Sequence, residues 1–185
     1  MDVNCTKSQS TSHPNTALHY FHFRKPESHD GVNVFELVKT CKPLDENSLY
    51  CNLLQCSHFR NTSLVAEIND QLAGFISAYR LPERADTLFI WQIAVHPAFR
   101  GNGLAPRMLH TLLQRLSGIR YVHTSITEDN KASWQTFRRL ALDLGADIHM
   151  RMLFDRERHF DNRHDSEQLV EIGPFTFFSA DNLGE

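Results

Sequence analysis

Apolar residues recur along the chain in two rhythms, one typical of strands and one typical of helices. Seven short segments are rich in β-branched and aromatic residues, which predicts strands. They are residues 19–24, 63–68, 71–79, 88–95, 121–126, 148–154 and 168–172. Between them, apolar residues spaced three and four apart predict four amphipathic helices. The resulting order, β-α-α-β-β-β-α-β-α-β-β, predicts a single mixed α/β domain over residues 19–172.

The first two helices have predicted caps and apolar faces. Ser28 is the predicted N-cap of the first helix, and Asp45 or Asn47 that of the second, because these side chains accept hydrogen bonds from free amides. The predicted apolar faces are Val32, Phe35, Val38 and Cys41 on the first helix, and Leu49, Leu53 and Cys56 on the second.

The remaining boundaries follow from turn chemistry. Asn69-Asp70 predicts a tight hairpin turn, and the polar residues 81–86 predict a loop. The third helix begins near Leu104 and the fourth near Asn130, and Gly145 ends the fourth, because glycine favours the left-handed position after a helix.

Composition and charge exclude several classes of partner. The chain has 185 residues, 41% of them hydrophobic, which is ordinary for a soluble globular protein. A net charge of −3 gives no basic surface for nucleic acid, and no apolar run approaches membrane-spanning length.

The two ends of the chain and its cysteines predict its location. Residues 1–18 are polar and lack the apolar core of a signal peptide, so we expect a disordered leader on a cytoplasmic protein. Residues 173–185 are expected to form a loose tail. The four cysteines are interpreted as free thiols, because disulfides are rare in the cytoplasm.

A strand, a glycine turn and a helix follow one another between residues 88 and 116. His96-Pro97 ends the strand, and Arg100-Gly-Asn-Gly103 leads into the helix. The first amides of a helix are free and its dipole is positive there, which favours an anion. No Lys-Ser/Thr pair follows the glycines, so the segment is not a P-loop. On two glycines alone, an ordinary strand-to-helix turn explains it as well.

This segment resembles the acyl-CoA signature of the GNAT family of N-acetyltransferases, Q/R-x-x-G-x-G/A, at Arg100, Gly103 and Ala105. The resemblance implies the GNAT fold, an α/β structure with a mixed central sheet of about seven strands, splayed central strands and flanking helices. It also implies acetyl-CoA as co-substrate and no metal. The cofactor-binding residues that it implies are Ile93, Ala94, Val95, Arg100, Gly101, Asn102, Gly103, Leu104, Ala105, Asn130, Ser133, Trp134 and Phe137.

The chain departs from the family at one catalytic position. GNAT enzymes often carry a tyrosine acid seven residues after the asparagine that opens the second crossover helix. Here Asn130 is followed by Phe137, which carries no proton. Tyr50 is a substitute candidate, although a half-buried anchoring phenol explains it as well, and solvent could also protonate the leaving thiolate.

Four segments further resemble the L-2,4-diaminobutyrate acetyltransferases of ectoine biosynthesis, which are described as homodimers. They are residues 44–59, 86–96, 127–137 and 163–167. The resemblance implies transfer of an acetyl group to the γ-amine of the diamino acid, which carries two ammonium groups. Carboxylates and aromatic faces attract such groups. The predicted substrate-binding residues are Asp45, Glu46, Tyr50, Trp91, Gln92, Asp165 and Glu167, and the catalytic candidates are Asp45, Tyr50, His164 and Glu167.

Several alternatives remain open from the sequence. Asp45 and Glu46 could instead complement the dipole of the helix that follows them, and Trp91 could be a core side chain. The cluster of His159, His164, Asp165 and Glu167 matches no recognised metal-ligand spacing, so a solvated polar loop explains it better. The rival functions are an acetyltransferase for another diamine or polyamine, a non-catalytic acyl-CoA-binding module and, last, a metal-dependent hydrolase.

Overall fold

A computed structural model describes residues 20–176. These residues form a seven-stranded sheet in the order β1-β2-β3-β4-β5-β7-β6. All neighbouring strands are antiparallel except β4 and β5, which are parallel. The elements are β1 (His22–Arg24), η1 (Ser28–Asp30), α1 (Gly31–Lys39), α2 (Leu49–Ser57), β2 (Leu64–Ile68), β3 (Gln71–Leu81), β4 (Arg84–Val95), η2 (Pro97–Phe99), α3 (Leu104–Arg115), β5 (Tyr121–Thr127), α4 (Lys131–Leu144), β6 (Ile148–Phe154) and β7 (Glu167–Ile172). The predicted order of strands and helices is confirmed.

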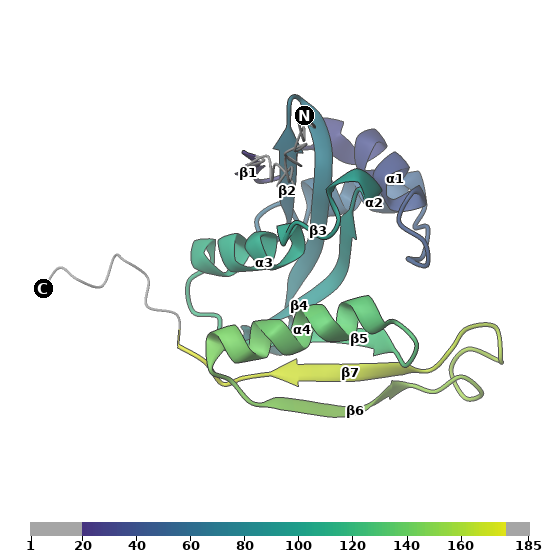
Figure 1. Cartoon of the computed structure of the whole chain (residues 1–185). Coiled ribbons are helices and arrows are strands. Elements are labelled where there is room, and N and C mark those ends of the chain that lie inside the picture. Colours follow the sequence, from purple (N-terminus) through teal and green to yellow (C-terminus); the bar gives the residue numbers. More distant parts are fainter. Residues whose placement is uncertain (1–19, 177–185) are drawn as a thin grey trace, which may run out of the picture.

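The sheet lies between two pairs of helices (Figure 1). α3 and α4 cover one face with the larger core, which includes Leu109, Leu112 and Phe137. α1 and α2 lie on the other face, where Val34 and Val38 pack against Phe75 of β3. Each helix therefore buries one apolar stripe against the sheet, which is how such layers are stabilised.

The sheet opens at its centre, between β4 and β5. These strands pair only from Thr87–Tyr121 to Ile90–Thr124, although β4 continues to Val95. A bulge in β4 accompanies the opening, because Ser77 pairs with Gln92 and Ala78 with Ile90, which leaves Trp91 as the extra residue. The predicted splayed central strands are confirmed, and their diverging ends leave backbone groups without strand partners.

The cap predicted for α1 was wrong, and its predicted apolar face is only partly correct, because Val38 and Cys41 are buried but Val32 is not. Val34, Leu37 and Val38 are buried, whereas the predicted Val32 is exposed. Ser28 begins a short 3-10 helix with Glu27 as its N-cap, and α1 itself starts from Asp30. The helix therefore begins later than predicted, after a 3-10 turn, and its buried face also includes Val34 and Leu37.

α2 also differs from its prediction. Its N-cap is Ser48, whose hydroxyl accepts a hydrogen bond from Cys51 N–H, and neither Asp45 nor Asn47 caps it. Asn52, Gln55 and Cys56 are buried, and Leu49 of the predicted face is exposed. The helix packs tightly against α1, because a Cβ on Gly31 would lie 2.5 Å from Leu53 Cδ2.

Two of the predicted boundaries also change. Residues 81–86 are not a loop: β3 runs to Leu81 and β4 starts at Arg84. Part of the predicted loose tail belongs to the domain, since Phe175 is buried and its N–H donates to Arg120 C=O. The Asn69-Asp70 turn is confirmed by the positive φ of both residues. The predicted leader, residues 1–18, lies outside the described residues.

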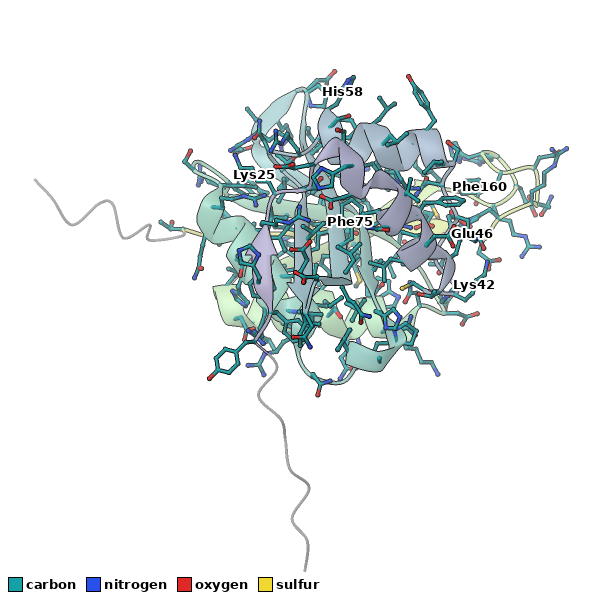
Figure 2. The ribbon with its side chains drawn as sticks, turned by 90° about the horizontal axis from the view of Figure 1, so that it is seen from above. Lys25, Lys42, Glu46, His58, Phe75 and Phe160 are labelled. Atoms are coloured by element: carbon teal, nitrogen blue, oxygen red, sulfur yellow. The ribbon has the colours of Figure 1, made fainter. Side chains whose placement is uncertain are left out.

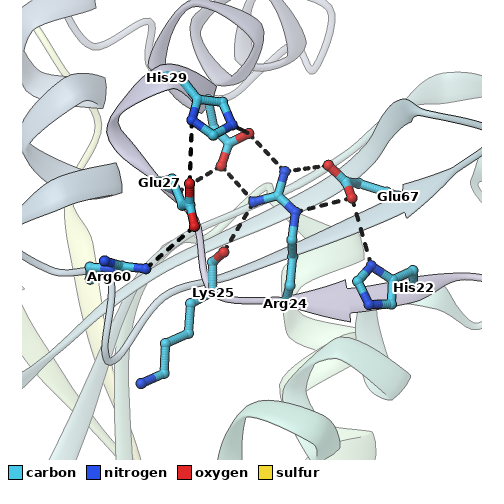
Figure 3. A network of polar contacts seen from close by, with 8 residues as sticks. His22, Arg24, Lys25, Glu27, His29, Arg60 and Glu67 are labelled. Atoms are coloured by element: carbon cyan, nitrogen blue, oxygen red, sulfur yellow. Dashed lines mark hydrogen bonds and ion pairs between the residues drawn. The ribbon is translucent and has the colours of Figure 1, made fainter.

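A polar network joins the first strand to the first helix (Figure 3). The guanidinium of Arg24 binds both Asp30 and Glu67. Burial would raise the pKa of Asp30, but hydrogen bonds from Arg24 and from Glu27 N–H hold it below its ordinary value. This network ties β1 to β2 and to the start of α1, and none of its residues lines the cleft described below.

Candidate active site

The predicted glycine turn has the shape of an anion site. Gly101 and Gly103 have φ of +78° and +68°, and a Cβ on either would meet no atom within 4 Å. Gly103 is the N-cap of α3. The N–H groups of Leu104 and Ala105 have no backbone acceptor within the helix, and Pro106 has no N–H. The turn therefore leaves open space in front of free amides.

A groove of about 330 Å³ runs from this turn to the opening of the sheet. The end of β4 forms one wall and the start of α4 the other. Val95 C=O accepts hydrogen bonds from Arg100 Nε at 3.0 Å and from Cys41 Sγ at 3.3 Å. Of the predicted cofactor-binding residues, this groove is lined by Ile93, Val95, Arg100, Gly101, Gly103, Leu104, Ala105, Asn130, Ser133 and Phe137.

A second cleft, of about 510 Å³, opens on the same end of the sheet. Three segments that are distant in the sequence enclose it: the α1–α2 loop, the diverging strands β4 and β5, and the β6–β7 loop. Both loops project on one side of the molecule (Figure 1). The predicted substrate-side residues that line it are Asp45, Trp91, Gln92, His164, Asp165 and Glu167.

The two loops meet across this cleft. His164 Nε2 lies 3.6 Å from Asp45 Oδ2. The His164 ring is held from the other side, because Nδ1 lies 2.7 Å from Asp165 C=O and the ring packs at 4.7 Å on Phe160. Because the Asp165 carbonyl can only accept, Nδ1 must carry a proton and donate this hydrogen bond, and Nε2 faces Asp45.

Glu167 differs from the other carboxylates of the cleft in its surroundings. Its Oε2 is buried and has no hydrogen-bond partner among the described residues. Burial raises the pKa of Glu167, and the negative charge of Asp45 adds to this, whereas a hydrogen bond from Ser125 and the charge of His164 oppose it. A carboxyl with a raised pKa is a better base than an ordinary one.

The neighbouring residues Gln92 and Trp91 of β4 differ in exposure. Gln92 is buried, and its amide donates to Asp45 C=O at 3.0 Å while its carbonyl accepts from Asn47 at 3.3 Å. It therefore holds the α1–α2 loop beside the cleft. Trp91 is 43% exposed and lines the cleft, so it is not a core side chain.

Glu46 and Tyr50 do not reach the cleft. Glu46 points outward and pairs with Lys42, and Figure 2 shows the two side chains together at the edge of the molecule. Tyr50 is 70% exposed on α2, so it is neither a half-buried anchor nor a lining residue. We therefore assign neither residue a role at the site.

Three of the predicted cofactor-binding residues do not line the 330 Å³ groove. Ala94 is buried against α1. The side chain of Asn102 donates to the carbonyls of Phe99 and Arg100, so it stabilises the turn itself. Trp134 lines a larger, shallow groove of about 1080 Å³ that continues from Gly101 and Gly103 along α4.

Phe137 is buried beneath both the groove and the cleft, where it contributes an apolar floor and no proton.

Residues 20–176 contain no group of three or more His, Cys, Asp or Glu side chains that could hold a metal ion. Within the same range, no helix combines the length and the apolar composition needed to cross a bilayer. The three described cysteines, Cys41, Cys51 and Cys56, are free.

Sequence reasoning missed several lining residues. Asn47 was considered only as a helix cap. Its contact with Gln92 joins residues that are far apart in the sequence, so no local pattern indicates it. Ser125 lies on the strand face opposite the core residues of β5, and strand alternation was the available signal. The missed residues with polar side chains are Asn47, Thr124, Ser125, Thr127, Arg156, Asn162 and Arg163.

The chain matches the model of the acetyltransferase (GNAT) family over residues 32–141. It is 48% identical over 167 residues to the L-2,4-diaminobutyric acid acetyltransferase of Methylotuvimicrobium alcaliphilum, covering 89% of this chain and 97% of that relative. It is also 48% identical over 152 residues to the Vibrio cholerae enzyme of the same name, covering 81% and 88% of the two chains.

A solved structure is similar as well. The diaminobutyrate acetyltransferase of Paenibacillus lautus, in complex with L-2,4-diaminobutyric acid and coenzyme A, superimposes with a TM-score of 0.81 at 34% identity. The match covers 86% of this chain and 98% of that one.

Proposed function

Since this chain belongs to the GNAT acetyltransferase family and, within it, to the diaminobutyrate acetyltransferases, we propose that its reaction takes place where the groove and the cleft meet. The chain transfers the acetyl group of acetyl-CoA to the γ-amine of L-2,4-diaminobutyrate, the acetylation step of ectoine biosynthesis. The products are Nγ-acetyl-diaminobutyrate and free CoA.

One observation carries the location of the reaction. The groove and the acidic cleft share part of their walls, so a thioester in one meets an amine in the other. The shared residues are Pro43, Leu44, Ile93, Asn130, Ser133 and Phe137. A direct attack in a ternary complex needs such a junction and no covalent protein intermediate.

The groove fits the extended CoA molecule. The glycine turn at the start of α3 is suited to its pyrophosphate, because the free amides and the helix dipole attract anions. Beyond the turn, the shallow groove along α4 presents Trp134 and the cations Lys131 and Arg138. These side chains are suited to the remaining, phosphorylated part of CoA.

The cleft supplies what the amine needs. An alkyl ammonium has a pKa of about 10, so a base must remove its proton before attack. We assign this role to Glu167, directly or through water, because it combines burial with an unpartnered oxygen. Asp45 and the exposed face of Trp91 attract the ammonium groups, and His164 keeps the Asp45 side of the cleft in place.

The leaving thiolate has no tyrosine beside it in this proposal. Phe137 holds the position where the family often has that acid, and Tyr50 faces away. Solvent protonates the thiolate, whose conjugate acid has an ordinary pKa of about 8.5.

We further propose that the enzyme is a homodimer that acts in the cytoplasm. The exposed edge strand β6, with Met150 and Met152, supports the dimer. Free thiols at Cys41, Cys51 and Cys56 support a reducing compartment.

Steady-state assays of CoA release test the proposal, with diaminobutyrate compared against ornithine, lysine and spermidine. We expect selective turnover of diaminobutyrate and, by mass spectrometry, one acetyl group on the γ-nitrogen. Glu167→Gln should lower kcat by roughly 10²- to 10⁴-fold and leave CoA binding intact. Normal turnover in both Glu167→Gln and Asp45→Asn would refute the assigned roles. CoA binding without turnover of any amine would refute the activity.

A further inference from the structure

The substrate cleft contains positive as well as negative side chains. Its carboxylates are Asp45, Asp165 and Glu167, and its guanidinium groups are Arg156 and Arg163. Before His164 is counted, these five charged groups sum to −1, which complements a substrate with two ammonium groups and one carboxylate. The carboxylates account for the ammonium groups, whereas the substrate carboxylate requires hydrogen-bond donors.

We propose that Arg156 binds the α-carboxylate of the substrate and so selects an amino acid over a plain diamine. The inference rests on the proposed function, since it concerns the same cleft. A guanidinium offers paired donors in the geometry of a carboxylate, and such charge-assisted bonds are stronger than neutral ones.

The position of Arg156 is fixed by its neighbours. Its Nη1 donates to Asp165 Oδ1 at 3.0 Å, and its backbone N–H donates to Ser166 Oγ at 2.9 Å. The turn behind it is held by Asp155, whose carboxylate accepts the N–H groups of Glu157 and Arg158. Asp165 uses only one of the five N–H donors of Arg156, and the side chain is about half exposed. Donors therefore remain for a ligand in the cleft.

The register of the hairpin brings Arg156 near Glu167. Phe154 pairs with Glu167 at the end of β6 and β7, and Arg156 and Asp165 follow two positions further along the two chains. Both positions lie in the loop just beyond the strands, where Arg156 and Asp165 line the same cleft as Glu167. In diaminobutyrate, four bonds of roughly 1.5 Å separate the γ-nitrogen from the carboxylate carbon, so a single molecule can reach both side chains.

Arg163 is the weaker candidate of the two arginines. Its side chain is 83% exposed, and its partner Asp161 does not line the cleft. The partner of Arg156, in contrast, lines the cleft itself, so the Arg156–Asp165 pair keeps the guanidinium at the wall.

The test compares two amines that differ only in the carboxylate: L-2,4-diaminobutyrate and 1,3-diaminopropane. Initial rates are measured at saturating acetyl-CoA for the wild type, Arg156→Gln, Arg156→Lys and the control Arg158→Gln. Arg158 lies in the same loop and does not line the cleft, so its variant removes an equal charge without the proposed contact.

We expect Arg156→Gln to raise the KM for diaminobutyrate about tenfold, the loss of one partly screened charged hydrogen bond. The KM for 1,3-diaminopropane should stay the same or fall, because a repelling cation is gone. Arg156→Lys should recover part of the preference, and Arg158→Gln should match the wild type.

Three results would overturn the inference: no change of KM in Arg156→Gln, an equal loss for both amines, or the same loss of preference in the control Arg158→Gln. CoA binding and thermal unfolding of each variant exclude misfolding as the cause. If the wild type fails to acetylate diaminobutyrate, the proposed function has failed. If it turns over normally and Arg156→Gln behaves like it, only the carboxylate contact has failed.

Discussion

At the residue scale, the chemistry depends on what surrounds Glu167. Burial is the largest cause of its raised pKa, and Asp45 and His164 act on that pKa in opposite directions. Both neighbours come from loops, Asp45 from the one between α1 and α2 and His164 from the one between β6 and β7, and they touch each other across the cleft. The two residues that join the loops therefore also adjust, in opposite directions, a pKa that burial raises.

This arrangement predicts opposite pH effects for two substitutions. Glu167 acts when deprotonated, so kcat/KM should fall as pH drops through its raised pKa. Asp45→Asn removes a charge that raises the pKa of Glu167, so the acidic limb should move to lower pH. His164→Gln removes a charge that lowers this pKa, so the limb should move to higher pH.

Profiles of kcat/KM between about pH 4 and 8, where carboxyl and imidazole groups titrate, measure these limbs. Glu171→Gln is the matched control, since Glu171 lies on the same strand outside the cleft, and its limb should stay in place. Shifts of both variants in the same direction would contradict the assignment of Glu167 as the base.

Single residues also mark the limit of sequence reasoning. Asp45 and Glu46 are adjacent acidic residues, and the sequence predicts substrate binding for both. In the structure, however, Asp45 faces His164 and Glu46 faces Lys42. Their directions depend on the backbone of the α1–α2 loop, which Gln92 holds from a strand more than forty residues away. No local sequence pattern indicates which of these side chains points into the cleft, and none indicates that Tyr50 points away from it.

At the scale of elements, the strand, glycine turn and helix between residues 84 and 115 carry the cofactor side of the site. This unit was predictable, because its apolar periods, its proline and its glycines each restrict the backbone locally. The faces of α1 and α2 were predictable only in part, since α1 starts after a 3-10 turn at residues 28–30 and α2 packs on it through Gly31 and Leu53. The strands β3 and β4 were predicted, but their outer ends at residues 81–86 were predicted as a loop because this end of the hairpin is largely polar.

The glycine turn yields a prediction with an internal control. Gly103 and Gly118 have nearly the same φ, +68° and +70°, and open space around the missing Cβ. Alanine at either position costs about 1 kcal/mol of left-handed strain. Of these two glycines, Gly103 lines the groove and Gly118 does not.

Gly103→Ala should therefore raise the KM for acetyl-CoA about tenfold, because relief of the strain moves the amides that face the pyrophosphate. Gly118→Ala should lower the unfolding free energy by a similar amount and leave this KM unchanged. Initial rates at varied acetyl-CoA and urea unfolding measure the two quantities. An unchanged KM in Gly103→Ala would place the pyrophosphate elsewhere.

At the scale of the whole molecule, the site exists because the sheet opens. β4 and β5 part after Ile90, and the α1–α2 and β6–β7 loops close the space from two sides. The order of elements and the resemblance to a family predicted this fold. The meeting of Asp45, His164 and Glu167 depends on two loops whose paths are set by long-range contacts, so spacing in the sequence could not give their geometry.

The outer edge of the sheet bears on assembly. β6 ends the strand order, and Met150 and Met152 are exposed on it, beside Leu142 of α4, which is 77% exposed. Met150 and Leu142 line the same shallow groove along α4 as Trp134, whereas Met152 does not line it. An unpaired apolar edge favours association with another chain, and a second copy of this chain is the partner we propose.

Light scattering coupled to size exclusion should therefore give twice the 21.4 kDa mass of the chain. Met150→Glu with Met152→Glu should shift the protein to the monomer, because two carboxylates on each copy would be buried against apolar groups. Val32→Glu is the control, since Val32 is an exposed apolar residue on α1, apart from β6, and it should remain dimeric. A monomeric wild type would refute the dimer, whereas a dimer that survives both β6 substitutions would place the interface on another face.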